Sequence, residues 1–263
     1  MPILRAQVGQ FDIHNFFIFF THEKHIGSVE WRNRRCTVSE LKFRHEWKYE
    51  INRMDMLILR QRLLAVAGHD EHAVDGIYRI RSLYFDDPTD RALREKIDGV
   101  NIRSKFRIRY YDGNTDFIRL EKKSKVNGLC NKQSTGLTRE QAQAIALGQT
   151  DRMKDAAEPL VRELYLEMKN KGLRPRTVVD YTREAFVYKP GNVRCTLDYN
   201  IRTGLNCVDF LNTEMVTIPA GDPVILLEVK WDEFLPSVIR DAVSLEGRRV
   251  GAFSKYAACR IYG

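Results

Sequence analysis

The segment "KFRIRYYDG", residues 105–113, carries the side chains whose types and spacing first suggest chemistry. Successive side chains of a β-strand point to opposite faces, so Lys105, Arg107 and Arg109 share one face while apolar and aromatic side chains share the other. Three neighbouring cations repel one another unless water or an anion screens them. The pattern therefore leaves two interpretations, a solvated surface or the wall of an anion-binding site.

Charged faces recur on other segments that alternate in the same way. A solvated face of an antiparallel sheet explains any single one of them. It explains the whole set less well, because these faces are rich in Arg, Lys and Glu rather than in Thr, Ser and Gln. The sequence therefore predicts strands that surround a lumen filled with charged side chains. The set comprises Glu46, Lys48 and Glu50; Arg107 and Arg109; Arg119, Glu121, Lys123 and Lys125; Tyr181 and Arg183; Arg194, Thr196 and Asp198; and Glu228 and Lys230.

A lumen of this kind suits a triphosphate or a polyphosphate chain. Arginine forks bind phosphate oxygens in bidentate fashion, and lysines act as point charges. A glutamate among the cations can bind Mg²⁺ or Mn²⁺, which bridges phosphates. The chain contains neither GxxxxGK[ST] nor GxGxxG, so side chains rather than a glycine-rich loop would hold the phosphates.

The elements that must position these side chains follow from periodicity and turn signals. Helices are predicted where Asn52 and Thr138 can act as N-caps and Gly172 can end a helix. Asp112-Gly113-Asn114 predicts a hairpin turn. Irregular alternation of strands and helices favours an α+β fold, a closed antiparallel eight-stranded β-barrel with flanking helices. The predicted strands are residues 43–51, 78–87, 105–113, 116–125, 176–186, 192–202, 214–219 and 224–231, and the predicted helices are 52–68, 88–99, 138–148, 156–172 and 236–243.

Composition limits the partners and the compartment. The 263 residues are 43% hydrophobic and 30% charged, with a net charge of +8, which favours a globular protein with an anionic partner. Aromatic stacking motifs of RNA-binding modules and a helix-turn-helix pattern are absent, so we expect no nucleic-acid partner. No segment has the length of a membrane span, and five scattered cysteines favour a reducing compartment, so we expect a cytoplasmic protein. Residues 1–40 are expected to be an extension of uncertain order that precedes one domain, 41–263.

The order of eight motifs resembles the VTC domain, the polyphosphate polymerase domain of vacuolar transporter chaperone complexes and their bacterial relatives. This family belongs to the CYTH-like superfamily of triphosphate tunnel metalloenzymes. The resemblance covers roughly residues 43 to 261. The motifs are "EWKYEI", "SLYFDD", "FRIRYYDG", "LEKKSK", "DYTREAF", "VRCTLD", "LLEVKW" and "FSKY".

The resemblance implies an antiparallel tunnel in which the ATP γ-phosphate is transferred to a growing polyphosphate chain and ADP is released. It implies that Glu228 holds Mn²⁺ or Mg²⁺. It also implies a set of residues that contact phosphate during the reaction: Lys48, Arg107, Arg109, Lys123, Arg183 and Arg194. Further substrate contacts are expected from Lys125, Lys230, Ser254 and Lys255.

Two departures leave alternatives open. The family has a lysine three residues before Lys255, where this chain has Ala252, so a phosphate contact is either lost or supplied by Arg248 or Arg249. The glutamate-rich opening motif of hydrolases and cyclases is replaced by Glu46-x-Lys48-x-Glu50, which favours the polymerase branch. A tunnel hydrolase of triphosphate or nucleoside triphosphate, a polyphosphate-binding subunit without activity, and a separate membrane partner remain open.

Two expectations concern single residues of the opening segment. Lys105 has no counterpart in the family motif and is expected to be solvated. Arg107 is expected to face the lumen rather than the core, so Arg107→Ala should weaken triphosphate binding with little loss of folding.

Overall fold

The computed structural model describes residues 43–260 except 72, 74, 205 and 206. The extension expected at residues 1–40 lies outside the described residues. Everything below concerns the unit that begins at Leu41.

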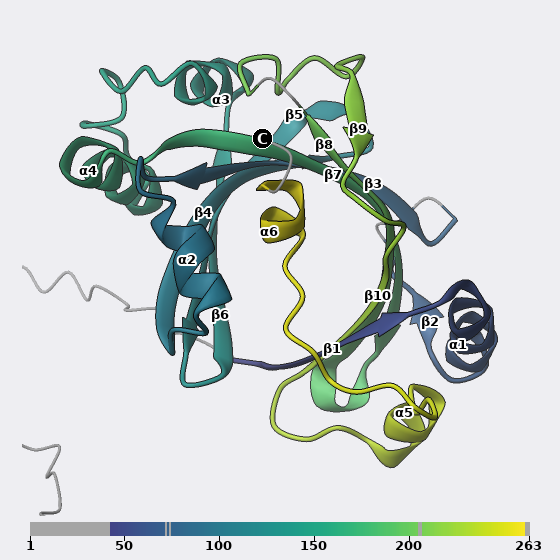
Figure 1. The fold of residues 1–263 in the computed structure, drawn as a ribbon. Coiled ribbons are helices and arrows are strands. Elements are labelled where there is room, and N and C mark those ends of the chain that lie inside the picture. Colours follow the sequence, from purple (N-terminus) through teal and green to yellow (C-terminus); the bar gives the residue numbers. More distant parts are fainter. Residues whose placement is uncertain (1–42, 72, 74, 205–206, 261–263) are drawn as a thin grey trace, which may run out of the picture. The chain divides into compact units, whose positions relative to one another are not determined.

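One antiparallel sheet dominates this unit (Figure 1). Eight strands follow one another across it in the order β1-β10-β8-β7-β3-β4-β5-β6, and they curl around a common lumen. Two short strands lie off this path, with β2 paired to β7 and β9 paired to β8. The strands are β1 His45–Ile51, β2 Gly68–His69, β3 Ile77–Asp86, β4 Ile102–Tyr111, β5 Asn114–Val126, β6 Leu129–Leu137, β7 Arg174–Tyr188, β8 Val193–Gly204, β9 Thr217–Pro219 and β10 Ile225–Trp231.

The barrel is not closed by a continuous hydrogen-bond ladder, which corrects the prediction of a closed barrel. The two end strands of the path, β1 and β6, meet at a seam where one isolated bridge pairs Arg44 with Cys130. The two backbone hydrogen bonds of this bridge measure 2.9 and 3.1 Å. Beyond the bridge, side chains connect the two ends of the path: Glu46 of β1 accepts from the thiol of Cys130 on β6 and pairs with Lys123 on β5.

Two strands, the two-residue β2 and the longer β6, were missed, and one strand was overestimated. β6 has the sequence "LCNKQSTGL", whose polar side chains do not alternate with apolar ones, so periodicity gives no strand signal. Such polarity is common on edge strands, which β6 is here. The strand predicted at 214–219 is reduced to β9, which contributes three residues outside the main path.

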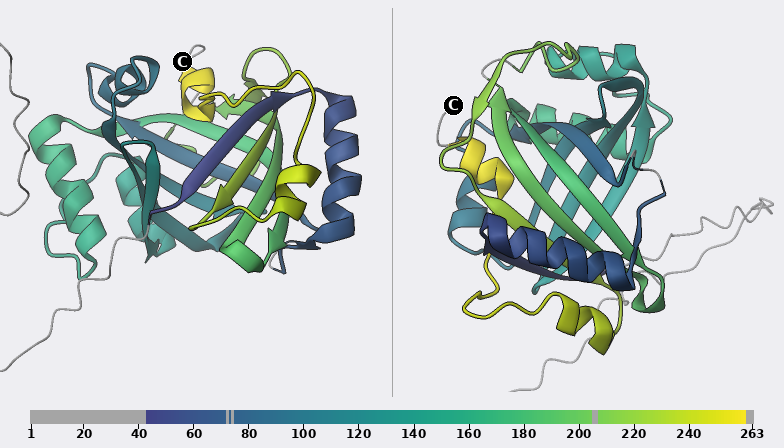
Figure 2. Two further views of the ribbon diagram at one scale, coloured as in Figure 1. Left: turned by 90° about the horizontal axis from the view of Figure 1, so that it is seen from below. Right: turned by 90° about the vertical axis from the view of Figure 1, so that its right-hand side faces the viewer.

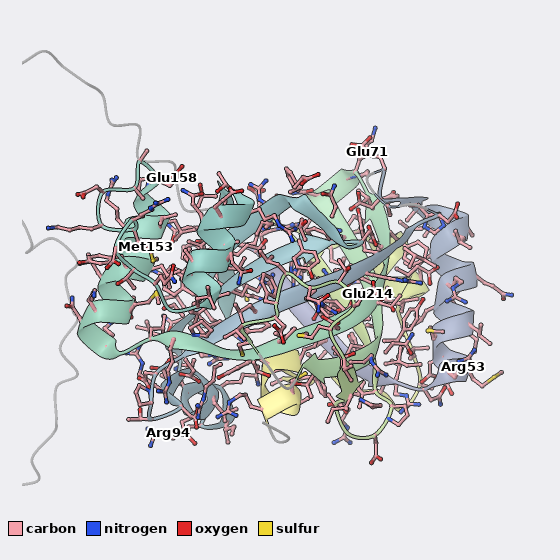
Figure 3. All side chains as sticks on the ribbon, turned by 90° about the horizontal axis from the view of Figure 1, so that it is seen from above. Arg53, Glu71, Arg94, Met153, Glu158 and Glu214 are labelled. Atoms are coloured by element: carbon pink, nitrogen blue, oxygen red, sulfur yellow. The ribbon has the colours of Figure 1, made fainter. Side chains whose placement is uncertain are left out.

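The helices cover the outer faces of the sheet at two places (Figure 2). Helices α1 and α5 pack where Leu197, Leu227 and Val229 point outward, forming one apolar cluster. Helices α3 and α4 pack on Ile108 and Leu120, and Met153 before α4 joins this second cluster (Figure 3). Burying these apolar faces on both flanks is what fixes which face of each strand looks inward. The helices are α1 Arg53–Val66, α2 Arg91–Ile97, α3 Arg139–Ala146, α4 Pro159–Lys171, α5 Ser237–Ala242 and α6 Lys255–Arg260, with a 3₁₀ turn at Pro190–Asn192.

The predicted helix starts have the expected caps. Asn52 accepts from the amide of Asp55 at 2.8 Å, and the Asp55 side chain accepts in return from the Asn52 amide. Thr138 and Gln141 form the same reciprocal pair at α3. No helix in the described part of the chain combines the length and the apolar composition that a bilayer crossing requires.

Candidate functional site

The lumen contains a cavity of about 170 Å³ whose lining is strongly basic. Eleven lysines and arginines line it together with three glutamates, which leaves an excess of eight positive charges. The lining comes from strands β1, β3, β4, β5, β6, β7 and β10, helix α2 and residues 251–255. Ten of the eleven residues predicted from the sequence are among them: Lys48, Arg107, Arg109, Lys123, Lys125, Arg183, Glu228, Lys230, Ser254 and Lys255.

Arg194 is the predicted residue that the fold does not bring to this cavity. Its guanidinium lies 2.8 Å from the carboxylate of Asp70, and 38% of its side chain is exposed. Its neighbour on the inward face, Asp198, lies closer to the cluster around Glu228. A phosphate-binding role for Arg194 therefore stays a prediction.

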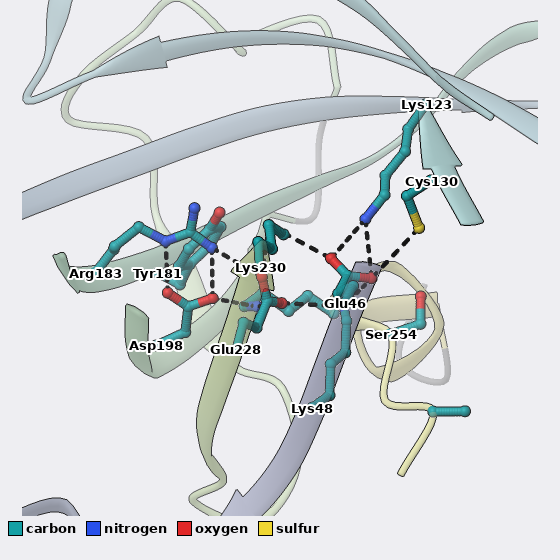
Figure 4. A network of polar contacts seen from close by, with 12 residues as sticks. Glu46, Lys48, Lys123, Cys130, Tyr181, Arg183, Asp198, Glu228, Lys230 and Ser254 are labelled. Carbon is teal, nitrogen blue, oxygen red and sulfur yellow. Dashed lines mark hydrogen bonds and ion pairs between the residues drawn. The ribbon is translucent and has the colours of Figure 1, made fainter. Parts of the chain in front are cut away.

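Glu228 lies at the centre of an ion-pair network (Figure 4). One carboxylate oxygen is 3.0 Å from Nζ of Lys48 and 3.1 Å from Nζ of Lys255. The other is 3.1 Å from Nζ of Lys230 and 3.4 Å from the guanidinium of Arg183. Four cations from four different elements therefore converge on a carboxylate that is 4% exposed.

Asp198 is a site residue whose importance the sequence pattern did not reveal. It is fully buried and holds Arg183 in a bidentate pair at 2.6 and 2.7 Å. Its second oxygen lies 2.5 Å from Nζ of Lys255. Asp198 shares a predicted inward face with Arg194, which was the available signal, but only the register β7–β8 places it opposite Arg183.

Glu46 links the seam to the cavity. Its carboxylate is 3.0 Å from Lys123, 3.4 Å from Lys230 and 3.7 Å from Lys48. The thiol of Cys130 on β6 donates to it at 3.7 Å (Figure 4). Glu46 therefore connects β1 to β5, β6 and β10 through side chains.

These carboxylates stay ionised because cations surround them. Burial opposes ionisation, but Lys123, Lys230 and Lys48 hold the pKa of Glu46 well below its ordinary value. Lys255 and Lys48 in the same way hold the pKa of Glu228 well below its ordinary value against the effect of burial. The two glutamates are thus negative at every physiological pH.

Arg107 and Arg109, the paired arginines of the opening segment, have different partners. Arg107 lies 2.6 Å from Glu121, which is 1% exposed, and donates to the Tyr84 hydroxyl at 2.9 Å. Arg109 donates to the hydroxyls of Ser82 and Tyr181 at 2.9 and 3.0 Å. Arg107 is therefore a structural cation as well as a lining residue, whereas Arg109 is held by neutral groups.

Lys105 lines the cavity, which corrects the expectation that it is solvated. Its ammonium lies 5.2 Å from the ring centroid of Tyr84 and 5.8 Å from that of Tyr256. Burial, together with Lys123 and other neighbouring cations, lowers the pKa of Lys105 to about 8. The side chain is therefore a cation that aromatic faces stabilise in place of a carboxylate.

The cation that lies beside Ala252 comes from a residue that was not predicted from the sequence. Arg248, one suggested substitute, pairs with Asp55 at 2.6 Å, and neither Arg248 nor Arg249 lines the cavity. Instead, the ammonium of Lys96 on α2 donates to the carbonyl of Ala252 and lines the cavity beside it. A helix remote in sequence thus supplies a cation at this place.

The residues fit a divalent cation only if the substrate supplies most of its ligands. Among the described residues, no group of three or more His, Cys, Asp or Glu side chains could enclose a metal ion. Glu228 and Glu46 offer hard oxygen donors and share Lys48 and Lys230 as neighbours. Mg²⁺ and Mn²⁺ bound through one or two carboxylates and several phosphate oxygens match this donor set.

Comparison with known proteins places the chain in a family. A family model of the VTC domain matches residues 43–261. No curated protein matches the chain. Similar solved structures include a "putative adenylate cyclase" from Bacillus halodurans, with 13% identity and a TM-score of 0.43 over 72% of this chain and 80% of that one. A protein from Pyrococcus horikoshii OT3 has 14% identity and a TM-score of 0.42 over 81% and 96% of the two chains.

Structural similarity with identities of 13–14% and TM-scores below 0.5 does not indicate what the chain does. The match to the family model does establish the family, because it spans every residue that the structure describes. The protein therefore belongs to the VTC domain family.

Proposed function

We propose that this protein is a polyphosphate polymerase that transfers the γ-phosphate of ATP to a growing inorganic polyphosphate chain and releases ADP. The single observation that carries the proposal is the cavity lining, with eleven cations and three glutamates. An excess of this size inside a protein favours a ligand that carries several negative charges. VTC domains and their tunnel relatives are commonly phosphotransferases or triphosphatases, which agrees with such a ligand.

The roles of the residues follow from their partners. Arg109 lines the lumen and donates to two hydroxyls, and no carboxylate of the described residues forms an ion pair with it, so it is available to a phosphate oxygen. Glu228 already orders four cations before a ligand binds: Lys48, Lys230, Lys255 and Arg183. Binding of a triphosphate therefore costs little additional side-chain conformational entropy. Phosphoryl transfer depends mainly on alignment and charge neutralisation, which this arrangement supplies.

Glu228, with Glu46 beside it, would hold Mg²⁺ or Mn²⁺ together with the phosphate oxygens of ATP. A bound divalent ion would neutralise charge on the transferred phosphoryl group. The acceptor is a phosphate that is already ionised, so the reaction requires no dedicated base. We place the reaction in the cytoplasm, where ATP is present and the four described cysteines, all free, would stay reduced.

The proposal is tested by incubating purified protein with ATP and Mn²⁺ or Mg²⁺ and sizing the products. We expect condensed phosphate of increasing chain length together with one ADP per phosphate transferred. Glu228→Gln should lose turnover by at least about a hundredfold while still binding triphosphate, because a cationic site remains. If wild-type protein binds ATP but makes neither product, the polymerase proposal is wrong.

Two other functions use the same cavity. A triphosphatase would transfer the phosphoryl group to water, so it would release orthophosphate without chain growth. A binding subunit would hold polyphosphate without turnover, and the replacement of the family lysine by Ala252 is the observation that favours it. The same product analysis separates all three functions.

A further inference from the structure

The strand register places like charges opposite one another at one wall of the cavity. In the β4–β5 ladder, Lys105 lies opposite Lys123 and Arg103 lies opposite Lys125. Directly opposed like charges destabilise a sheet. Lys123 is compensated by Glu46 at 3.0 Å, but the other three form no ion pair with any described carboxylate. The folded protein therefore holds mutually repelling cations close together at this wall of the cavity.

Lys96 of α2 joins this group. Its ammonium donates to a backbone carbonyl, that of Ala252, and Arg103, Lys48 and Lys125 are the charged groups that act on it. Burial and this repulsion lower the pKa of Lys96. Glu95 of the same helix also lines the cavity, but its ion pair is with Arg91 at 3.9 Å. We call Lys96, Arg103, Lys105 and Lys125 the cationic wall.

The cationic wall and the Glu228 network lie on opposite sides of the lumen. In the eight-strand path, β10 with Glu228 is second and β4 with Lys105 is sixth. The Glu228 side contains Glu228, Asp198 and Glu46, each already paired with cations. These carboxylates offset much of the positive charge of the cations around them, and Glu228 and Glu46 can bind a divalent ion that a phosphate carries. A metal-free phosphate is therefore attracted more strongly by the cationic wall, where no carboxylate offsets the charge of Lys105, Lys125 or Arg103 among the described residues.

We propose that the cationic wall is the subsite for the metal-free acceptor, the terminal phosphate of a condensed phosphate chain. This assignment rests on the proposed polymerase function. The acceptor's terminal oxygen forms the new bond to the γ-phosphorus. The bond from that phosphorus to the β–γ bridging oxygen breaks, and ADP leaves with its electron pair. No proton is exchanged, and the cations of the wall offset the charge of the approaching acceptor.

Binding measurements without turnover test the subsite. Pyrophosphate, as the acceptor probe, is titrated calorimetrically into the full-length protein in chelator at pH 7. We expect Lys105→Gln and Lys125→Gln each to raise the pyrophosphate Kd at least about tenfold, since each variant removes a charge-assisted contact. Lys154→Gln, at an exposed turn position, is the matched control and should leave this Kd unchanged.

A nucleotide titration supplies the contrast. The Kd of a non-hydrolysable ATP analogue with Mn²⁺ should change less than about threefold in Lys105→Gln, because only screened, longer-range repulsion is removed. The subsite proposal is wrong if wild-type protein binds no pyrophosphate, if Lys105→Gln leaves its Kd unchanged, or if the nucleotide Kd rises as much. Pyrophosphate binding with this pattern but without ATP turnover would instead contradict the polymerase function and the acceptor role, and would support a condensed-phosphate site at the cationic wall.

Discussion

At the scale of single residues, the buried carboxylates organise the cavity as much as the cations do. Glu121 and Asp198 are nearly or fully inaccessible, and each holds an arginine that reaches the lumen. A buried ion pair is a weak source of net stability, but losing one partner leaves a charge that neither water nor a counterion compensates. Lining cations of this kind therefore act in folding and in ligand binding together.

Arg107 provides the first prediction, and it replaces the expectation that this residue is dispensable for folding. Arg107→Ala should lower the free energy of unfolding by about 3 to 5 kcal/mol, because Glu121 stays buried without its closest cation and keeps Lys132 at 3.1 Å and the more distant charge of Arg109. Arg107→Ala/Glu121→Gln should recover at least half of that loss. Urea unfolding measures both, and a single variant as stable as wild type would contradict the prediction.

Lys105 gives a prediction about pH. Its pKa of about 8 lies below the ordinary lysine value, so it loses its proton and its positive charge as pH rises from 7 to 9. Pyrophosphate affinity should fall over this range, and Lys105→Arg, which stays charged, should remove the step near pH 8. The charged and titratable groups that surround Lys105 and influence this step are Lys48, Lys123, Arg107, Tyr84 and Tyr256.

Tyr84 requires its own control in that experiment. Arg107 and Lys105 overcome the effect of burial and lower the pKa of Tyr84 to about 7, so it gains negative charge in an adjoining pH range. Tyr84→Phe should remove a step near pH 7 and shift the Lys105 step to lower pH, because the ionised Tyr84 hydroxyl raises the pKa of Lys105. Identical pH profiles for wild type, Lys105→Arg and Tyr84→Phe would contradict both assignments.

At the scale of elements, the seam between β1 and β6 is the weakest part of the sheet. Each neighbouring pair along the path shares a ladder of several residues, whereas β1 and β6 share one bridge. Glu46 compensates by contacting Lys123, Lys230 and Cys130. The same side chain therefore supports both the seam and the cavity, so ligand binding and seam stability are coupled.

Hydrogen exchange tests the seam. Amides of β6 should exchange faster than those of β7 and β8, which are paired on both sides, because local opening there breaks fewer hydrogen bonds. Glu46→Gln should accelerate exchange in β6 further. Glu163→Gln is the matched control, since it breaks an ion pair between β5 and α4 on the outside of the sheet. Equal acceleration by both variants would argue against a special role for the seam.

At the scale of the whole molecule, the positive charge that is concentrated in the cavity should govern the binding of anions. The chain has a net charge of +8, and the cavity lining alone has an excess of eight positive charges. Folding brings these cations together without a ligand, and the unfolded chain keeps them apart in water. An anion that binds only the folded state must therefore stabilise the fold.

Thermal unfolding measures this stabilisation. Tripolyphosphate at about 100 times its Kd should stabilise the protein by about 2.7 kcal/mol and raise the Tm accordingly. Sulfate at equal ionic strength is the control for general screening and should raise the Tm much less, since it carries fewer charges than the cavity offers. An equal effect of the two salts would contradict a specific polyanion site.

The sequence was sufficient for the alternating charged faces and for most strands and helices, because period-two alternation fixes which side chains share a face. Ten of the eleven site residues predicted from the charged faces and the family motifs line the cavity. The sequence could not predict β6, whose polar residues carry no period, or the unclosed seam. Register between strands remote in sequence decides that Asp198 faces Arg183 and that Lys105 faces Lys123. Packing of α2 decides that Lys96 reaches Ala252. These contacts depend on three-dimensional proximity, which local periodicity does not contain.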